Sequence, residues 1–266
     1  MNLPGLEAYL RADTASFTEF LSQVAPHQLP SGQGEHLAPH GTTVVAAMHE
    51  GGVLMAGDRR ATMGHAIAYR EVKKVHEADD QTVIGIAGTA GVAIELVKLY
   101  QVELEHYEKM EGTQLSFAGK GSRLSGMLRA TMGRAMQGLA AIPLLAGWDG
   151  DRGAIFAFDI AGGRYPERHR AAIGSGAVHA IGALRKLHDP AGSRDQAIRA
   201  TLHALWDAAD QDAGTGGIDL GRQIYPQLYT VEATGVRELS DSDVQSAIEA
   251  VVTDRQQHPD GPRADL

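Results

Sequence analysis

The chain has 266 residues with 33 acidic against 24 Lys and Arg residues, and the resulting net charge of −9 argues against a general nucleic-acid or anionic-membrane binder. Cysteine is absent, which excludes disulfides, thiolate metal sites and cysteine nucleophiles. We expect a cytoplasmic protein, because no apolar run reaches the roughly 18 residues of a membrane helix and no basic segment followed by an apolar one opens the sequence.

The first 41 residues differ in composition from the rest of the chain. They hold four of the ten prolines. The spacing of Phe17, Phe20, Leu21 and Val24 predicts a short amphipathic helix, and a loop rich in Pro, Gly and His follows up to Gly41. Composition alone allows a mobile N-terminal arm, or a pro-segment that is removed.

Regular patterns begin at Thr42, and strands and helices come in blocks. The expected elements, in chain order, are strands 42–48, 53–58, 72–77 and 81–87; helices from a cap at Thr89 to Tyr107 and from Leu124 to Ala135; strands 142–148, 154–160 and 164–169; helices 177–188 and 194–211; strands 223–232 and 236–239; and a helix 243–255 before a flexible tail, 256–266.

This block order favours an α+β fold and not a doubly wound parallel sheet, in which strands and helices alternate strictly. Two antiparallel sheets between two helical layers are the simplest arrangement that covers every apolar face. Residues 42–255 therefore form one domain.

Several common catalytic motifs are absent. Gly121 follows Lys120, so no P-loop is present, and neither H-E-x-x-H nor Gly-x-Ser-x-Gly occurs. His49, His106 and His203 are interpreted as surface or core residues.

The pair Gly41-Thr42 is the most informative candidate for chemistry. A threonine hydroxyl is a weak nucleophile and needs a base. Cleavage after Gly41 would give Thr42 a free α-amino group with an unperturbed pKa of roughly 7.7–8.0, suitable for a general base. Gly41, which lacks Cβ, lets the hydroxyl approach the preceding carbonyl. Without further support, the two threonines would be interpreted as the beginning of a strand, with no role in catalysis.

Further motifs in the same order closely resemble those of proteasome β subunits, in particular the actinobacterial type. The motifs are Gly41-Thr42-Thr43, Gly57-Asp58-Arg59-Arg60-Ala61-Thr62, Val72-Lys73-Lys74-Val75, Gly85-Ile86-Ala87-Gly88-Thr89-Ala90, Leu104-Glu105-His106-Tyr107-Glu108-Lys109, Ala135-Met136-Gln137-Gly138-Leu139, Gly147-Trp148-Asp149, Gly174-Ser175-Gly176 and Asp212-Ala213-Gly214-Thr215-Gly216-Gly217. The resemblance runs from about Thr42 to Leu239. It implies the four-layer αββα sandwich of the N-terminal nucleophile hydrolase fold.

The resemblance also implies a catalytic set. Thr42 matches the nucleophile and Lys74 the lysine that stabilises charge on its oxygen and lowers the pKa of its amine. Asp58 matches the partner of that lysine.

Four further positions match residues around the nucleophile. Gly88 matches the residue whose N–H forms the oxyanion hole. Ser175 and Asp212 match residues that orient the terminal amine. Thr215 stands where the family usually has Ser; it keeps the hydroxyl and adds a methyl group.

Substrate-binding positions follow by the same mapping. Thr62 and Ala90 match backbone groups that pair with an extended peptide. The primary side-chain pocket would be lined by Ala61, Val72, Ile86, Ala90 and Ile94. This lining is apolar, so we predict cleavage after large hydrophobic residues, with His76 near the wall able to widen the preference.

The resemblance implies a threonine endopeptidase without cofactor or metal, made as a precursor and matured by autolysis between Gly41 and Thr42, with residues 1–41 as the pro-segment. It implies a heptameric β ring between proteasome α subunits, an ATPase ring that feeds unfolded polypeptides, and no nucleic-acid or membrane partner. The alternatives are the two-ring bacterial threonine protease relative and a non-catalytic proteasome shell subunit.

Overall fold

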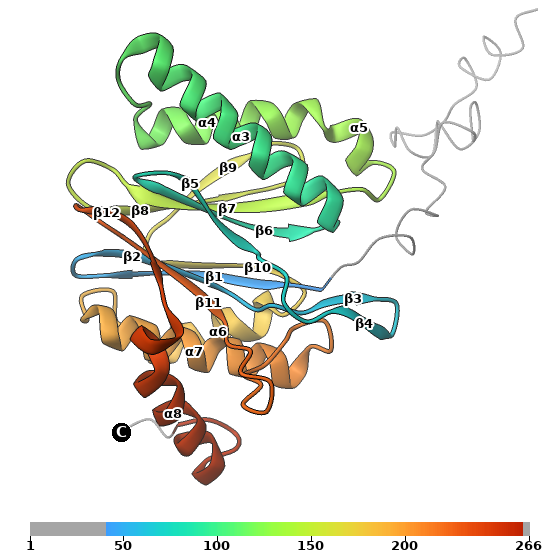
Figure 1. Cartoon of the computed structure of the whole chain (residues 1–266), viewed down its shortest axis with the longest axis vertical. Helices are drawn as coiled ribbons and strands as arrows, with labels where there is room; N and C mark the ends of the chain where they lie inside the picture. Colours follow the sequence, from blue (N-terminus) through green and yellow to red (C-terminus); the bar gives the residue numbers. More distant parts are fainter. Residues whose placement is uncertain (1–40, 263–266) are drawn as a thin grey trace, which may run out of the picture.

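The computed structural model describes residues 41–262. Two five-stranded antiparallel sheets stack face to face, and helices cover the outer face of each (Figure 1). The first sheet has the order β10-β1-β2-β11-β12, from Arg170–Gly174, Thr43–His49, Gly52–Gly57, Gln227–Glu232 and Gly235–Leu239. The second has the order β5-β6-β7-β8-β9, from Val75–Asp79, Thr82–Gly88, Ala141–Trp148, Gly153–Phe158 and Arg164–Glu167.

The helices form the two outer layers. The second sheet is covered by α3 (Ala90–Glu111), α4 (Phe117–Ala130) and the short α5 (Met132–Ala135), and the first sheet by α6 (Ala177–Leu187) and α7 (Arg194–Gln211). A last helix, α8 (Asp241–Gln257), packs on α7. The predicted α+β, four-layer αββα arrangement is confirmed.

Strand β1 is buried on both faces, which explains its unbroken apolar sequence. Val44 and Ala46 point into the core between the two sheets, whereas Val45 packs with the helices α6 and α7. Successive side chains of a strand point to opposite faces, so a strand in an inner layer must be apolar at every position. Because β1 is packed on both faces, it is held in position, and so is Thr42, the residue that precedes it.

The sequence analysis missed two features of the strands. Residues 164–174 form two strands in different sheets, β9 and β10, where one strand over 164–169 was expected. A small hairpin of β3 (Ala61–Met63) and β4 (Ala66–Tyr69) stands outside both large sheets. Its side chains are mostly exposed, so no apolar alternation marks it.

Other strands and helices begin or end at residues that differ from the predicted ones, for local reasons. The strand expected over 72–77 begins at Val75, because the N–H of Val72 bonds to the carbonyl of Arg59 and not to a sheet neighbour. The helix expected over 124–135 is interrupted at Thr131, whose hydroxyl donates to the Leu128 carbonyl. The strand expected over 223–232 begins at Gln227.

The two ends of the chain lie partly outside the described residues. The helix predicted around Phe17–Val24 falls there, as does most of the segment 1–41. Helix α8 continues to Gln257, two residues into the predicted tail. Within residues 41–262, no helix is long and apolar enough to cross a membrane.

Candidate active site

Thr42 stands immediately before β1, and only 6% of it is exposed. In this uncut chain its hydroxyl donates to the carbonyl oxygen of Gly41 at 2.5 Å. Gly41 has φ +91°, and a Cβ there would lie 2.6 Å from the Gly214 carbonyl oxygen. Glycine is therefore required before Thr42 by both its backbone conformation and the space around it.

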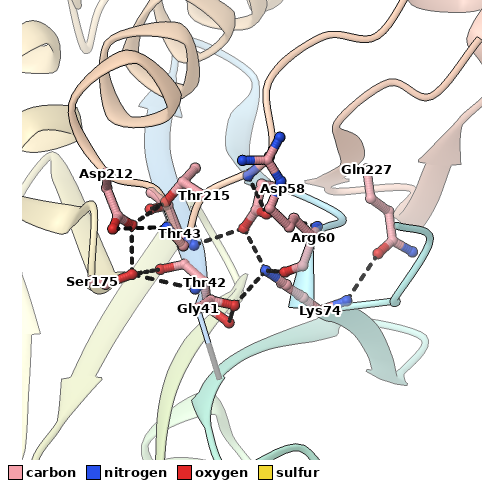
Figure 2. Close-up of polar contacts among 12 residues, drawn as sticks. Gly41, Thr42, Thr43, Asp58, Arg60, Lys74, Ser175, Asp212, Thr215 and Gln227 are labelled. Atoms are coloured by element: carbon pink, nitrogen blue, oxygen red, sulfur yellow. Dashed lines mark hydrogen bonds and ion pairs between the residues drawn. The ribbon is translucent and has the colours of Figure 1, made fainter. Parts of the chain in front are cut away.

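A buried ion pair lies on one side of the Gly41–Thr42 peptide bond (Figure 2). Lys74 Nζ donates to Asp58 Oδ1 at 2.6 Å, to the Gly41 carbonyl at 2.9 Å and to the Arg60 carbonyl at 2.5 Å. Three acceptors thus surround the three hydrogens of one ammonium group. Burial lowers the pKa of Lys74, and the charge of Asp58 opposes this effect.

The Asp58 carboxylate is fixed by backbone donors as well as by Lys74. Its Oδ1 accepts from the N–H of Thr43, and its Oδ2 from the N–H groups of Arg60 and Gly216, each at 2.8 Å. The carboxylate therefore ties the start of β1 to the turn after β2 and to the loop that follows α7. Because every lone-pair direction is used, Lys74 is held in one position.

A second chain of polar contacts lies on the other side of Thr42 (Figure 2). Asp212 accepts from the hydroxyls of Ser175 at 2.5 Å and Thr215 at 2.6 Å. Ser175 Oγ lies 3.5 Å from the Thr42 nitrogen, which donates to it. Since the Thr215 hydrogen is directed to Asp212, Thr43 donates to Thr215 in their 2.6 Å contact. The nitrogen of Thr42 is thus the end of a fixed hydroxyl–carboxylate network.

Hydrogen bonds keep Asp212 ionised. Burial alone would raise its pKa, but the bonds from Ser175, from Thr215 and from the N–H of Gly214 outweigh burial and lower the pKa. A charged acceptor is suited to orienting hydroxyl donors.

A pocket of about 370 Å³, including its solvent-open mouth, adjoins Thr42. It is lined by Gly41, Thr42, Ala61, Val72, Lys73, Lys74, His76, Ile86, Gly88, Ala90, Ala93 and Ile94. All five residues expected to line a side-chain pocket are present, although Ile94 is 43% exposed. Thr62 does not line this pocket; its hydroxyl lies beside Gly41, 2.7 Å from where a Cβ would stand.

Gly88 ends β6 at the rim of this pocket with φ +116°. A Cβ on this residue would lie 2.2 Å from the Ala140 carbonyl oxygen. The position accepts only glycine without rearrangement, and this leaves its backbone open to a molecule in the pocket.

The structure thus brings together the seven residues predicted as catalytic, from six separate parts of the chain. It adds Thr43, Arg60 and Gln227, which the sequence analysis did not assign to the site. Gln227 Oε1 accepts from the N–H groups of Lys74 and Val75, each at 3.3 Å, and no sequence pattern marks it. For Thr43, the Thr-Thr pair in the sequence was a pattern that could have indicated a role in the site. Residues 41–262 contain no group of three His, Asp or Glu side chains placed to hold a metal ion.

The four-layer αββα sandwich with a polar site at the head of an inner strand defines the class of N-terminal nucleophile hydrolase folds. The Proteasome family, described as "Proteasome subunit", matches residues 38–221. The chain therefore belongs to the proteasome subunit family, whose members form a protease.

Curated relatives cover nearly the whole chain. It is 48% identical over 267 residues to "Proteasome subunit beta" of Streptomyces griseus (97% of this chain, 95% of the relative), and 50% identical over 260 residues to the protein of that name from Parafrankia sp. (95% of each). A third, from Acidothermus cellulolyticus, is 49% identical over 263 residues (94% and 91%). The predicted resemblance to actinobacterial β subunits is confirmed, and neither alternative is favoured.

Proposed function

We propose that the chain is a threonine endopeptidase, the catalytic β subunit of a proteasome core, with Thr42 as its nucleophile. One observation carries the proposal: the Thr42 hydroxyl and the Lys74 ammonium converge on the carbonyl oxygen of Gly41, at 2.5 and 2.9 Å. A hydroxyl beside a carbonyl that is polarised by a cation brings the nucleophile next to the group that it would attack.

Maturation would begin with attack of Thr42 Oγ on the carbonyl carbon of Gly41. The hydroxyl proton leaves, the C–N bond breaks, and the Thr42 nitrogen takes a proton, which gives an ester between Gly41 and the Thr42 side chain. Water then hydrolyses the ester. The products are a carboxylate on Gly41, a free hydroxyl and a free amine on Thr42, and residues 1–41 are released as the pro-segment.

Substrate hydrolysis would follow the same geometry with the amine exposed. The Thr42 amine accepts the hydroxyl proton, while Ser175 and Asp212 orient that amine from the side opposite Lys74. Lys74, held by Asp58, stabilises negative charge on the attacking oxygen. The N–H of Gly88 is proposed to bind the oxyanion, a contribution that is worth ~3–4 kcal/mol in hydrolases.

The pocket beside Thr42 supports a preference for large hydrophobic residues before the cleaved bond. Ala61, Val72, Ile86, Ala90 and Ile94 supply its apolar lining. We also propose that Thr62 and Ala90 bind the substrate main chain as an added strand, because β3 carries Thr62 past Gly41 and Ala90 lies at the pocket rim.

Family membership supports assembly into a proteasome core. We infer a heptameric β ring stacked against rings of α subunits, an ATPase ring that unfolds and feeds polypeptide substrates, and a cytoplasmic location.

N-terminal sequencing of the assembled particle tests the proposal. A chain that begins Thr-Thr-Val-Val and hydrolyses peptides with hydrophobic residues at the cleaved position is the expected result. An assembled and active particle that retains Met1, or any residue before Thr42, would overturn the mechanism. An intact and inactive chain in the particle would instead show a non-catalytic shell subunit.

A further inference from the structure

A second pocket, separate from the proposed substrate pocket, lies behind Asp58. It measures about 340 Å³ with its open mouth included and is lined by Arg59, Arg60, Arg70, Gly216, Gly217, Asp219, Ile224, Tyr225 and Pro226. Three arginines therefore line one small space. The residues that line the pocket come from three segments: the turn after β2, the residue after β4 and the loop before β11.

The charges around this pocket are not balanced within the described residues. Arg59 Nε is buried there without a hydrogen-bond partner, and neither Arg59 nor Arg70 forms an ion pair with any residue of 41–262. Among the described residues, the Arg60 guanidinium donates only to the carbonyl of Ala213, at 3.2 Å. A buried donor without a partner costs free energy, so the pocket favours a ligand that accepts hydrogen bonds.

The two nearby carboxylates cannot supply that acceptor. Asp219, which lines the pocket, is engaged by the backbone and the guanidinium of Arg222, each at 2.9 Å. Asp58 is engaged by Lys74 and by three backbone N–H groups. Three arginines therefore line the pocket against one lining carboxylate, that of Asp219, which is already paired with Arg222.

We propose that Arg59, Arg60 and Arg70 form a binding site for one small oxyanion, a carboxylate or a phosphate. Guanidinium groups bind both anions through paired, charge-assisted hydrogen bonds. None of the three arginine side chains contacts Thr42, and Arg60 meets the proposed catalytic residues only through its backbone, which bonds to Lys74 and Asp58.

A bound oxyanion would connect the three segments that meet at the pocket. Arg60 directly precedes β3 and Arg70 directly follows β4, so the anion would bridge the two ends of the exposed β3–β4 hairpin. Hydrogen exchange of the amides in residues 61–69 should slow when the anion binds.

Titration with inorganic phosphate tests the site, at constant ionic strength, on the full chain before assembly and on the assembled particle. One saturable phosphate per free chain is expected. Binding to the double variant Arg59→Gln/Arg70→Gln should be weaker by about tenfold or more. The matched control is Arg123→Gln/Arg237→Gln, which loses the same charge from exposed arginines paired elsewhere with Glu103 and Asp243. It should bind as the unchanged chain does.

The two preparations distinguish the source of the anion. Binding to both the free chain and the particle supports a small solution anion, and binding to the free chain alone supports a carboxylate from a neighbouring copy in the particle. Absence of saturable binding to the free chain, or equal binding by the Arg59/Arg70 variant, would overturn the proposal. If the double variant fails to fold, Arg70→Gln, at an exposed position, provides the same comparison, and Arg70→Lys should fall between it and the unchanged chain.

Discussion

The ammonium group of Lys74 donates a 2.9 Å hydrogen bond to the carbonyl oxygen of Gly41. This carbonyl belongs to the peptide bond that the proposed maturation cuts, so the same cation that would assist the mature enzyme already polarises the precursor. Burial lowers the pKa of Lys74, and the charge of Asp58, 2.6 Å away on its other side, opposes that effect.

Replacing Lys74 with Met should prevent self-cleavage and reduce peptide hydrolysis by at least ~10²–10⁴-fold, the range of a positioned acid–base or charged group. The matched control is Lys109→Met. Lys109 is exposed on α3 and contacts Glu105 at 2.5 Å, a surface pair worth ~0–1 kcal/mol, so the control should mature and cleave normally.

Stability must be measured in the same experiment, because Lys74→Met leaves the Asp58 carboxylate buried without its partner. Breaking a buried pair in this way costs ~3–5 kcal/mol. Denaturant unfolding should show this loss for Lys74→Met and almost none for Lys109→Met. A stable, folded Lys74→Met chain that still cuts itself would contradict the role given to Lys74.

Thr42→Ala should abolish maturation and peptidase activity while assembly continues, since the hydroxyl that would attack is removed. Thr42→Ser keeps the hydroxyl and should retain both. Intact mass of the assembled particle reports the cut directly, and residual hydrolysis by the alanine variant would count against Thr42 as the nucleophile.

The layered fold was predictable because strand and helix periodicity change in blocks. Val44, Val45 and Ala46 are apolar without alternation, as a strand covered on both faces must be. The hairpin β3–β4 was not predictable by the same reasoning. Its Met63 and Tyr69 are 50% and 63% exposed, so burial imposes no pattern on it.

The composition of the site was predictable only through the resemblance. Asp58 and Ser175 lie 117 residues apart in sequence, and no local pattern brings their side chains to Thr42. Gln227 was missed because its role is to accept from the backbone of Lys74 and Val75, which depends on sheet packing. The three arginines of the proposed anion site were missed because Arg70 becomes a neighbour of Arg59 only through the unpredicted hairpin.

Gly88→Ala should reduce peptide hydrolysis strongly and lower stability. Its φ of +116° disfavours any side chain, and the new Cβ would lie 2.2 Å from the Ala140 carbonyl oxygen, so the strand end and the proposed oxyanion donor must move. Gly91→Ala is the control, because nothing lies within 4 Å of its Cβ position. Alanine favours the helix there by up to ~1 kcal/mol. Equal activity of the two variants would exclude a role for the Gly88 backbone.

Thr215→Ser should leave activity close to that of the unchanged chain, because the hydroxyl that bonds Asp212 at 2.6 Å is retained. Thr215→Val keeps the shape and removes the hydroxyl. It leaves Asp212 with one donor fewer and Thr43 without its acceptor, at a cost of ~1–3 kcal/mol for each buried group. Thermal unfolding and peptide hydrolysis of the two variants measure the effect. If the valine variant is as active as the serine variant, the hydroxyl is not required at this position.

His76 in the wall of the substrate pocket should make cleavage preference depend on pH. Its Nε2 is buried without a partner among the described residues. Burial lowers its pKa below the usual 6.5, against a hydrogen bond with the Lys73 backbone that raises it. The imidazole is therefore neutral at pH 7.5 and gains a positive charge only as the pH falls below 6.5.

The measurement uses two peptides that differ only in having Glu or Leu at the cleaved position. The hydrolysis rate of the Glu peptide is divided by that of the Leu peptide, and this ratio is followed from pH 7.5 to 5.5. The ratio cancels the titration of the nucleophile, because both peptides use the same amine. It should be low at pH 7.5 and rise several-fold below pH 6.5, since a protonated His76 attracts the glutamate, which itself stays ionised above its pKa of about 4.3. His76→Leu should give a ratio that stays low throughout. A ratio that rises equally in this variant would place the titrating group elsewhere.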